Sequence, residues 1–416
     1  MKSIIRDINL AESGHQKIEW ARKNMPLLRG IEEDFRQTKP FRGLKIALSI
    51  HLEAKTACLC KVLAAGGAEM FITGSNPLST QDDIAADLVK SGLNVYAWYN
   101  ATEEEYNSHI QNVIINEPDI IIDDGGDLVN LIHGKYPELI KNVIGGCEET
   151  TTGIIRLKSM EKNNLLKFPM VAVNNADCKH LFDNRYGTGQ SVWDAINRTT
   201  NLIVAGKKVV VCGYGWCGKG VAMRAKGFGA DVIITEVNPV KAIEAIMDGF
   251  NVMSMKAAAL VGDVFITVTG CKGVITMEHM QTMKDGALLC NAGHFNVEIE
   301  VDNLIKQAVD SRKERHNIVG YQMNSKNWIY LLAEGRLVNL AAGDGHPVEI
   351  MDMSFAIQAL SAEYLVNNKG KLKNEVISVP DEIDKMVAYR KLKYSGVEID
   401  TLSEEQDKYL NSWNMD

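Results

Sequence analysis

Several features are absent from the sequence, and each absence argues against a class of protein. The 416 residues carry no excess of positive charge, since 45 Lys and Arg stand against 53 Asp and Glu for a net charge of −8. This balance argues against nucleic acid or a membrane surface as a partner. No apolar run reaches the length needed to cross a bilayer. The charged first residues, 1–7, hold no secretory apolar core, so we expect a cytoplasmic protein.

The eight cysteines are scattered. Neither Cys58 and Cys60 nor Cys212 and Cys217 have the spacing of zinc ligands, and a chain of this length does not need disulfides. We therefore expect reduced, mostly buried thiols and no metal site. The sequence also has no internal repeat, low-complexity tract or long flexible linker, and its length of 416 residues predicts two or three domains.

The segment 209–220, VVVCGYGWCGKG, has the pattern of a dinucleotide-binding turn. An apolar strand precedes it, and Gly213, Gly215 and Gly218 would supply a tight turn, close approach to a pyrophosphate and tight helix packing. Glu236 ends the next apolar run, where an acid binds a ribose 2′-hydroxyl and repels a 2′-phosphate. The segment therefore predicts NAD rather than NADP.

Strand-like runs alternate with helical stretches both before and after this segment, which indicates parallel sheets. We predict an α/β fold with two doubly wound parallel-sheet domains, a cleft between them and a short C-terminal helical tail. Such sheets bind ligands beyond the carboxyl ends of their strands. In the first half of the chain those positions hold His51, Ser75, Asn76, Asp123, Asp124, Asn174 and Asn175.

Several polar residues have two interpretations from the sequence alone. Lys179 and Asp183 are four apart, so on a helix they would form a surface ion pair. Beside a nicotinamide, the same pair could take a proton from an alcohol as hydride leaves. His51 could be a structural histidine or an acid/base group. Asp123 and Asp124, which open a glycine turn, could be solvated, bind a metal or act as acids and bases.

Six motifs point to one family. They are DDGGDL from Asp123, EETTTG from Glu148, FDNRYG from Phe182, GYGWCGKG from Gly213, GHFNVEI from Gly293 and LLAEGRLVNL from Leu331. With them the chain closely resembles the S-adenosyl-L-homocysteine hydrolases over nearly its whole length.

The resemblance implies a domain plan and a reaction. It predicts a substrate-binding domain at 1–180 and 348–385, an NAD-binding domain at 186–346 and a tail at 386–416. A tightly bound NAD would oxidise the 3′-hydroxyl of a nucleoside thioether, which acidifies C4′ so that the thiol at C5′ can be eliminated. Water then adds and the ketone is reduced again. The resemblance also implies a homotetramer.

Matching the motifs residue by residue gives three sets of expected site residues. The catalytic set is His51, Asp124, Glu149, Lys179, Asp183 and His294. The substrate-binding set is Glu53, Lys55, Thr150 and His346. The cofactor-binding set is Thr150, Thr151, Thr152, Asn184, Gly213, Gly215, Trp216, Cys217, Gly218, Glu236, Thr269, Asn291 and Asn339.

The roles follow the same resemblance. Lys179 and Asp183 would handle the proton of the 3′-hydroxyl. His51 and Asp124 would be the acid/base groups for C4′ and for the leaving group at C5′. His294, with the Phe that follows it, would form a gate beside the homocysteine site. Two alternatives stay open at this point: a dehydrogenase that releases NADH, and a catalytically silent relative that binds NAD.

Three positions depart from the longer eukaryotic form of the family. Glu53 and Lys55 stand where that form has threonine and glutamate, Thr188 replaces a cysteine, and the lysine- and tyrosine-bearing tail is missing. The departures fit a shorter branch that includes S-inosyl-L-homocysteine hydrolases. Lysine only donates hydrogen bonds, so Lys55 would suit O6 of hypoxanthine, and Glu53 could accept from N1–H. S-adenosyl-L-homocysteine is nevertheless the first expected substrate.

Overall fold

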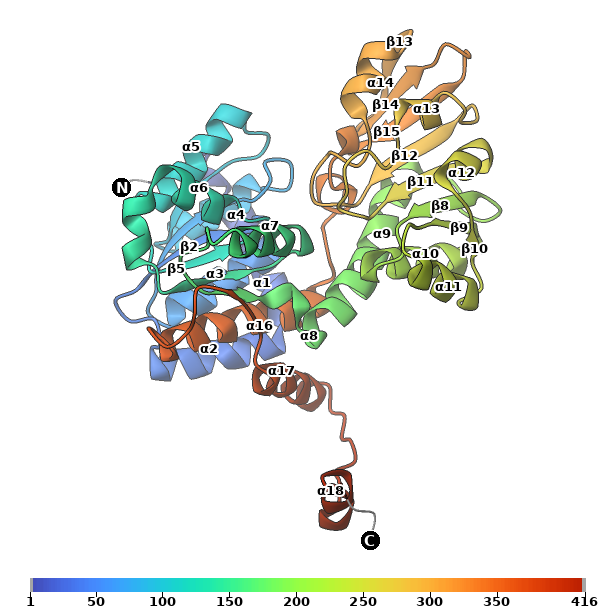
Figure 1. The fold of residues 1–416 in the computed structure, drawn as a ribbon. Helices are drawn as coiled ribbons and strands as arrows, with labels where there is room; N and C mark the ends of the chain where they lie inside the picture. Colours follow the sequence, from blue (N-terminus) through green and yellow to red (C-terminus); the bar gives the residue numbers. More distant parts are fainter. Residues whose placement is uncertain (1–2, 414–416) are drawn as a thin grey trace.

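The protein is built on two eight-stranded sheets that lie in separate bodies (Figure 1). The computed structural model describes residues 3–413. The first sheet runs in the order β1-β4-β3-β2-β5-β6-β7-β16, and all its strands are parallel. Its strands are β1 (Ile4–Ile5), β2 (Lys45–Ser49), β3 (Glu69–Thr73), β4 (Asn94–Ala97), β5 (Ile120–Asp123), β6 (Gly145–Glu148), β7 (Met170–Ala172) and β16 (Val376–Ser378).

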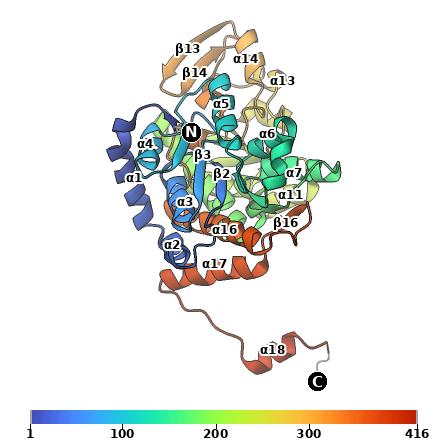
Figure 2. The same ribbon diagram turned by 90° about the vertical axis from the view of Figure 1, so that its left-hand side faces the viewer.

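Helices cover both faces of this sheet, as the near-continuous apolar runs of its central strands require. One face is covered by α1 (Ala11–Lys23), α2 (Pro26–Thr38), α3 (Ala54–Ala65), α4 (Asp82–Lys90), α16 (Val348–Asn367) and α17 (Asp381–Tyr394). The other face is covered by α5 (Glu103–Ile114), α6 (Asp127–Lys135) and α7 (Thr151–Lys162). Figure 2 shows α1 and α4 on one side of β2 and β3, and α6 and α7 on the other.

The second sheet has the order β10-β9-β8-β11-β12-β15-β14-β13. It is parallel from β10 to β15 and ends in antiparallel strands. Its strands are β8 (Lys208–Cys212), β9 (Asp231–Thr235), β10 (Asn251–Val252), β11 (Val264–Thr267), β12 (Ala287–Asn291), β13 (Asp310–Arg315), β14 (Ile318–Gln322) and β15 (Trp328–Leu332).

Helices pack on both faces of this sheet too. One face carries α9 (Thr188–Thr200), α10 (Trp216–Gly227), α11 (Pro239–Met247) and α15 (Val338–Ala341). The other carries α12 (Met255–Val261), α13 (Met277–Met280) and α14 (Val301–Gln307). The predicted pair of doubly wound sheets is thus confirmed.

The sequence patterns did not predict six strands, which are β1, β6, β10, β13, β14 and β16, and three of these have an identifiable reason. β13 reads DSRKER and is fully exposed, so it has no apolar face to reveal it, and its hairpin partner β14 was missed with it. β6 begins Gly145-Gly146, a composition that strands disfavour. A Cβ on Gly146 would lie 2.6 Å from the carbonyl oxygen of Ile121, so only glycine fits between the neighbouring strands.

The chain crosses between the two bodies twice. It leaves the first through α8 (Asp177–Lys179) and a π-helical segment (His180–Gly187), and it returns just before α16. β16 then pairs with β7, with Val376 opposite Met170. The discontinuous first domain that the resemblance implied therefore corresponds to a single continuous sheet.

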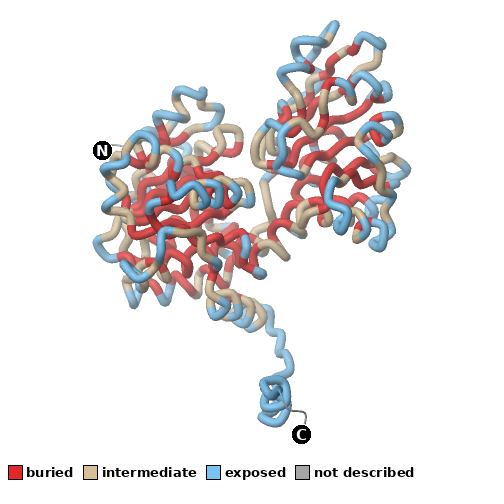
Figure 3. Tube along the Cα trace, viewed as in Figure 1, coloured by how far each residue is buried: buried red, intermediate tan, exposed pale blue. Residues whose placement is uncertain are grey.

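The C-terminal tail differs in extent from the expectation. The predicted boundary at 385/386 falls inside α17, which packs against α2 and α16 and buries Val387 completely. We propose that the first domain extends to Tyr394. Beyond it, α18 (Glu404–Leu410) stands away from the body with every described residue exposed (Figure 3). In residues 3–413, no helix has both the length and the apolar character of a membrane span.

Candidate active site

A single large cavity of about 1110 Å³ lies between the two bodies. Its wall comes from the loops that follow the carboxyl ends of strands in both sheets. In each sheet the strand order reverses at one point, between β2 and β5 in the first and between β8 and β11 in the second. Open α/β sheets bind ligands at this reversal, and here the two reversals face one cavity.

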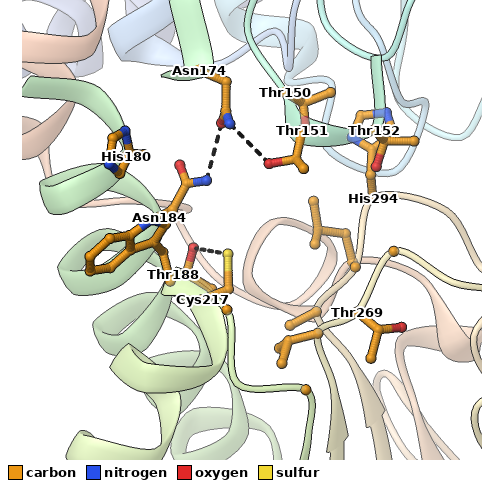
Figure 4. A pocket seen from close by; sticks show the side chains of 18 of the residues that line it. Thr150, Thr151, Thr152, Asn174, His180, Asn184, Thr188, Cys217, Thr269 and His294 are labelled. Carbon is orange, nitrogen blue, oxygen red and sulfur yellow. Dashed lines mark hydrogen bonds between the residues drawn. The ribbon is translucent and has the colours of Figure 1, made fainter. Parts of the chain in front are cut away.

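Most of the predicted site residues line this cavity. On its wall are His51, Glu53, Lys55, Asp124, Glu149, Thr150, Thr151, Thr152, Lys179, Asp183, Asn184, Gly213, Gly215, Trp216, Cys217, Glu236, Thr269, His294, Asn339 and His346. Gly218 and Asn291 lie behind the wall. Figure 4 shows how several of the wall residues converge from both bodies on the same space.

His51 and Asp124 form an ion-pair geometry at the reversal of the first sheet. The His51 Nε2 atom lies 3.4 Å from Asp124 Oδ2, and His51 Nδ1 lies 2.6 Å from Ser79 Oγ. Ser75 Oγ donates to Asp124 Oδ2 over 3.0 Å. Burial lowers the pKa of His51 to about 4, which outweighs the opposing effect of Asp124. His51 is therefore neutral near pH 7 and can accept a proton.

His294 reaches the same carboxylate from the second body. Its Nδ1 atom lies 3.8 Å from Asp124 Oδ1, and its ring centroid lies 5.8 Å from that of His51. Phe295 packs edge-on against His294, with ring centroids 4.6 Å apart. No metal site was expected, yet the potential ligand atoms of His51, Asp124 and His294 all lie within 4.8 Å of one another, so this group could hold a cation.

Lys179 is the centre of a second polar cluster. Its ammonium donates to Asn174 Oδ1 at 3.0 Å and to Asn184 Oδ1 at 2.9 Å, and it lies 3.5 Å from both Glu149 and Asp183. Lys179 is 5% exposed and Asp183 is 2% exposed. The surface ion-pair interpretation is therefore wrong, because the turns from α8 into the π-helical segment face the cavity instead of solvent.

Helix α16 donates a hydrogen bond to each of the two carboxyl groups of this cluster, those of Asp183 and Glu149. Ser354 Oγ donates to Asp183 at 2.7 Å, and Gln358 Nε2 donates to Glu149 at 2.5 Å. His346 Nδ1 lies 2.5 Å from Asp183 Oδ1, so this predicted purine-edge residue also belongs to the cluster.

These contacts give the carboxyl groups of Asp183 and Glu149 different pKa values. Burial favours a raised pKa for Asp183, but Lys179 and His346 hold it below its ordinary value. Burial raises the pKa of Glu149 to about 8, despite the opposing effect of Lys179. One carboxyl is thus ionised and the other protonated near pH 7.

Two buried acids under the cavity hold its loops in place. Glu148 Oε1 accepts the backbone N–H groups of Gly125 and Thr150, each at 2.9 Å, and so ties two wall loops together. Burial raises the pKa of Glu148 well above its ordinary value and that of Asp123 to about 7. Neither residue lines the cavity, which indicates a positioning role.

Glu53 and Lys55 both reach the cavity because the chain before α3 is not helical. Glu53 is the N-cap, with φ −137° and ψ −177°, and its carboxylate accepts the N–H groups of Lys55 and Thr56. The Lys55 ammonium lies 2.9 Å from Glu53 Oε2 and donates to the carbonyl of Asp344 at 2.8 Å. A buried donor and a buried acceptor thus stand side by side on the cavity wall.

The glycines of the second sheet have the geometry of a nucleotide cradle. Gly213 has a φ of +109°, which favours glycine. A Cβ on Gly215 would meet nothing within 4 Å, so its surroundings are open toward the cavity. A Cβ on Gly218 would lie 2.0 Å from the Gly213 carbonyl oxygen, which explains why Gly218 lies behind the wall and packs α10 against β8.

Glu236 stands at the end of β9 with its carboxylate held by the backbone. It accepts the N–H groups of residues 214, 237 and 238 over 2.7–2.9 Å. Burial opposes ionisation, but these N–H groups lower the pKa of Glu236. An ionised acceptor at this position suits a ribose diol.

Thr269 and the amide residues complete the cofactor side. Thr269 Oγ1 donates to the buried Glu298 at 2.6 Å. Asn339 Nδ2 donates to Ser191 at 3.1 Å, while its buried Oδ1 has no partner within residues 3–413. Buried acceptors are normally satisfied, so this orphaned oxygen and the open space at Gly215 fit a bound dinucleotide.

The structure revises the role expected for Asn291. Its side chain accepts from Thr267 and Gly293 and donates to the carbonyl groups of Gly293, Phe295 and Gly335. With its hydrogen-bonding capacity used internally, Asn291 holds the loop that carries His294 and does not face the cofactor space.

Sequence reasoning left some site residues out of the expected sets. Asn174 follows a strand, and its position at a strand end was the signal that could have included it. Ser354 and Gln358 carried no such signal, since their partners lie far away in the sequence. Glu298 lies within the motif that begins at Gly293, and that motif was the signal that could have included it.

Comparison with known proteins agrees with this geometry. The model of the S-adenosyl-L-homocysteine hydrolase NAD-binding domain matches residues 184–345, and that of S-adenosyl-L-homocysteine hydrolase matches residues 2–135. An S-inosyl-L-homocysteine hydrolase of Methanocaldococcus jannaschii is 58% identical, with 98% of each chain covered. The chain belongs to the S-adenosyl-L-homocysteine hydrolase family.

Other relatives are named either S-inosyl-L-homocysteine hydrolase or adenosylhomocysteinase. An S-inosyl-L-homocysteine hydrolase of Methanococcus maripaludis is 59% identical over 99% of each chain. An adenosylhomocysteinase of Thermococcus kodakarensis is 56% identical over 98% of this chain and 97% of the relative. As a member of this family the chain is a hydrolase with NAD as its cofactor, which favours hydrolysis over the dehydrogenase and silent alternatives.

Proposed function

We propose that the chain reversibly hydrolyses S-adenosyl-L-homocysteine to adenosine and L-homocysteine. The observation that carries this proposal is that one cavity joins the Lys179 cluster, the His51–Asp124 pair and the nucleotide cradle. In this proposal the Lys179 cluster serves oxidation at C3′, the His51–Asp124 pair serves elimination at C5′, and the nucleotide cradle retains the cofactor.

When bound, NAD accepts the hydride from C3′ and later returns it. We place the cofactor against Gly213, Gly215, Glu236, Thr269 and Asn339, which line the second body's side of the cavity. Thr150, Thr151, Thr152 and Asn184 face it from the first body (Figure 4).

The Lys179 cluster receives the proton of the 3′-hydroxyl in this proposal. The two carboxyl groups raise the pKa of Lys179 against the effect of burial, so it is an ammonium that orients the oxygen. The ionised Asp183, 3.5 Å away and paired with His346, is the acceptor toward which the proton can move.

The His51–Asp124 pair serves the elimination. Neutral His51 can take the C4′ proton, since burial keeps its pKa at about 4. The resulting imidazolium would be stabilised by Asp124 at 3.4 Å and can protonate the departing thiolate. His294 lies beside Asp124 with Phe295 packed against it, and in this proposal the two rings limit the access of water to the intermediate.

Cofactor retention tests the reaction class. The purified protein should keep NAD through gel filtration and show no steady build-up of NADH when the thioether is added. Continuing release of NADH in proportion to product would support the dehydrogenase alternative instead.

A second substrate, S-inosyl-L-homocysteine, is favoured by the pairing of Lys55 with Glu53. Adenine presents a donor at position 6 and an acceptor at N1, and hypoxanthine presents the reverse. The Lys55 ammonium can only donate and a Glu53 carboxylate can only accept, so the pair matches hypoxanthine.

The deciding measurement is kcat/KM for the two thioethers under matched conditions. A site that hydrogen-bonds one edge can reject the other by orders of magnitude. If Lys55 contacts the base, Lys55→Glu will shift the ratio toward the adenosyl compound. Lys158→Glu is the control, because Lys158 is exposed on α7 and lies outside the cavity. An unchanged ratio in Lys55→Glu would show that Lys55 does not contact the base.

We also propose a homotetramer in the cytoplasm. The outer face of α11 exposes Val240, Ile243 and Met247, and α18 exposes Tyr409 and Leu410, surfaces that subunit contacts would cover. All eight cysteines are free, as in a reducing compartment. Light scattering tests the assembly, and a monomer would contradict it.

A further inference from the structure

Arg156 and Asp127 form a charged pair just outside the wall of the cavity. Arg156 Nη1 lies 2.8 Å from Asp127 Oδ1 and donates to the carbonyl of Gly125 at 2.6 Å. The side chains are 35% and 28% exposed, so both remain accessible to a solute. The hydrogen bonds found within residues 3–413 use only Nη1 of the guanidinium, which leaves other N–H groups to donate.

The pair lies next to the group that handles the leaving thiol. Gly125, which Arg156 contacts, directly follows Asp124, and a Cβ on Gly125 would lie 2.7 Å from His294 Nε2. The Arg156 guanidinium carbon also lies 6.0 Å from the centroid of the Phe295 ring. Arg156 therefore lies beside both the Gly125 turn and the Phe295 ring, next to the His294–Phe295 pair.

The chemistry of the leaving group matches this pair. Homocysteine carries a carboxylate and an ammonium on one carbon, joined to sulfur by a short chain. A guanidinium and a carboxylate 2.8 Å apart present the two opposite charges that such a zwitterion needs. Tyr106 donates its hydroxyl to Asp127 Oδ2 at 3.2 Å and so fixes the carboxylate in place.

We propose that Arg156 and Asp127 form the subsite for the amino-acid half of the substrate, with Arg156 binding the carboxylate and Asp127 the ammonium. This inference rests on the proposed function and adds the residues that select the thiol. It gives Arg156 a role in substrate binding as well as in holding the Gly125 turn.

The test uses the NAD-loaded enzyme in the synthetic direction, with nucleoside plus thiol. Arg156→Gln should raise KM for L-homocysteine by about 10- to 100-fold, the effect expected from losing a charged hydrogen bond. KM for the nucleoside and the NADH absorbance that nucleoside alone produces should stay unchanged. Arg390→Gln is the matched control, since Arg390 pairs with Asp34 at 2.7 Å with a similar exposure of 34% and lies outside the cavity.

Thiol analogues separate recognition from a purely structural role. Mercaptobutyrate keeps the carboxylate, so Arg156→Gln should weaken its use as it does that of homocysteine. Aminopropanethiol and propanethiol lack the carboxylate, so their kcat/KM should not change. An equal loss with propanethiol would show that Arg156 only supports the loop and would overturn the proposal. If the wild type forms no thioether with any thiol, the proposed function itself fails, which is a distinct result.

Discussion

The two sheets have the same strand order, but they carry different residues at the point where that order reverses. From β4 to β7 and from β10 to β15 the order is the same, with the first strand of each unit in the third position. At the reversal of the first sheet stand His51 and Asp124, whose side chains are an imidazole and a carboxyl group. At the reversal of the second stand Gly213 and Thr269, which offer backbone and hydroxyl groups. Topology therefore positions a site, and side chains decide whether it moves protons or holds a nucleotide.

The pKa shifts follow this division. On the first sheet, burial lowers the pKa of His51 and raises those of Asp123 and Glu149. On the second, backbone N–H groups lower the pKa of Glu236. Substitutions in the first sheet should therefore change rates and pH dependence, and those in the second should change cofactor content.

The largest effect is expected for Lys179→Ala. Loss of the ammonium should slow oxidation of the nucleoside at least ~10²-fold, as for other acid/base groups. It also removes the ammonium beside the buried, ionised Asp183, which should cost about 3–5 kcal/mol of stability. Stopped-flow NADH absorbance and urea unfolding measure the two effects. Lys158→Ala, at an exposed position of α7 outside the cavity, should change neither, and a near wild-type rate in Lys179→Ala would remove the lysine from the mechanism.

His51→Gln should change how stability depends on pH. The folded-state pKa of His51 is about 4, below the ordinary histidine value of 6.5. Below pH 6.5 the unfolded chain binds a proton that folded His51 does not, so the wild type loses stability as the pH falls toward 4. Relative to His51→Gln the loss should reach about 3 kcal/mol. Urea unfolding across this range measures it, with the exposed His316→Gln as control. Parallel curves for wild type and His51→Gln would contradict the lowered pKa.

Gly215→Val should affect the cofactor and spare the fold. A Cβ there meets no protein atom within 4 Å, so the added side chain should extend into nucleotide space. We expect at least tenfold weaker NAD binding, about 1.4 kcal/mol, with an unchanged melting temperature. Bound NAD after gel filtration is the measurement. Gly218→Ala provides the contrast, since its Cβ would clash with the Gly213 carbonyl and should impair folding. Full NAD content in Gly215→Val would place the cofactor elsewhere.

The smallest effect is expected for Glu149→Gln at neutral pH. Because the pKa of Glu149 is raised to about 8, glutamine mimics its protonated form. Above pH 8 the wild type gains a second negative charge beside Asp183 and should lose activity. The pH–rate profile of Glu149→Gln should lack this alkaline limb. An identical limb in both proteins would assign it to another group.

The sequence was sufficient for the parts of the molecule that local patterns encode. The order of strand, glycine turn, helix and acid located the nucleotide unit, and strand ends located His51 and Asp124. Burial of Lys179 could not be foreseen, because the pattern of residues four apart is the same on an exposed helix. Ser354 and Gln358 were missed for a related reason: they act through contacts across 171 and 209 positions. Such contacts depend on how α16 packs and leave no trace in spacing.

The late return of the chain has a consequence for synthesis on the ribosome. The strands of the second sheet are all complete by Leu332, whereas the first sheet waits for β16 at Val376–Ser378. Ser354 and Gln358, which hold Asp183 and Glu149, also emerge only after the second body has been made. The nucleotide-binding body can therefore fold first during translation, and the proton-handling cluster is completed near the end. A nascent chain halted before α16 could hold cofactor while still lacking these two supports of its chemistry.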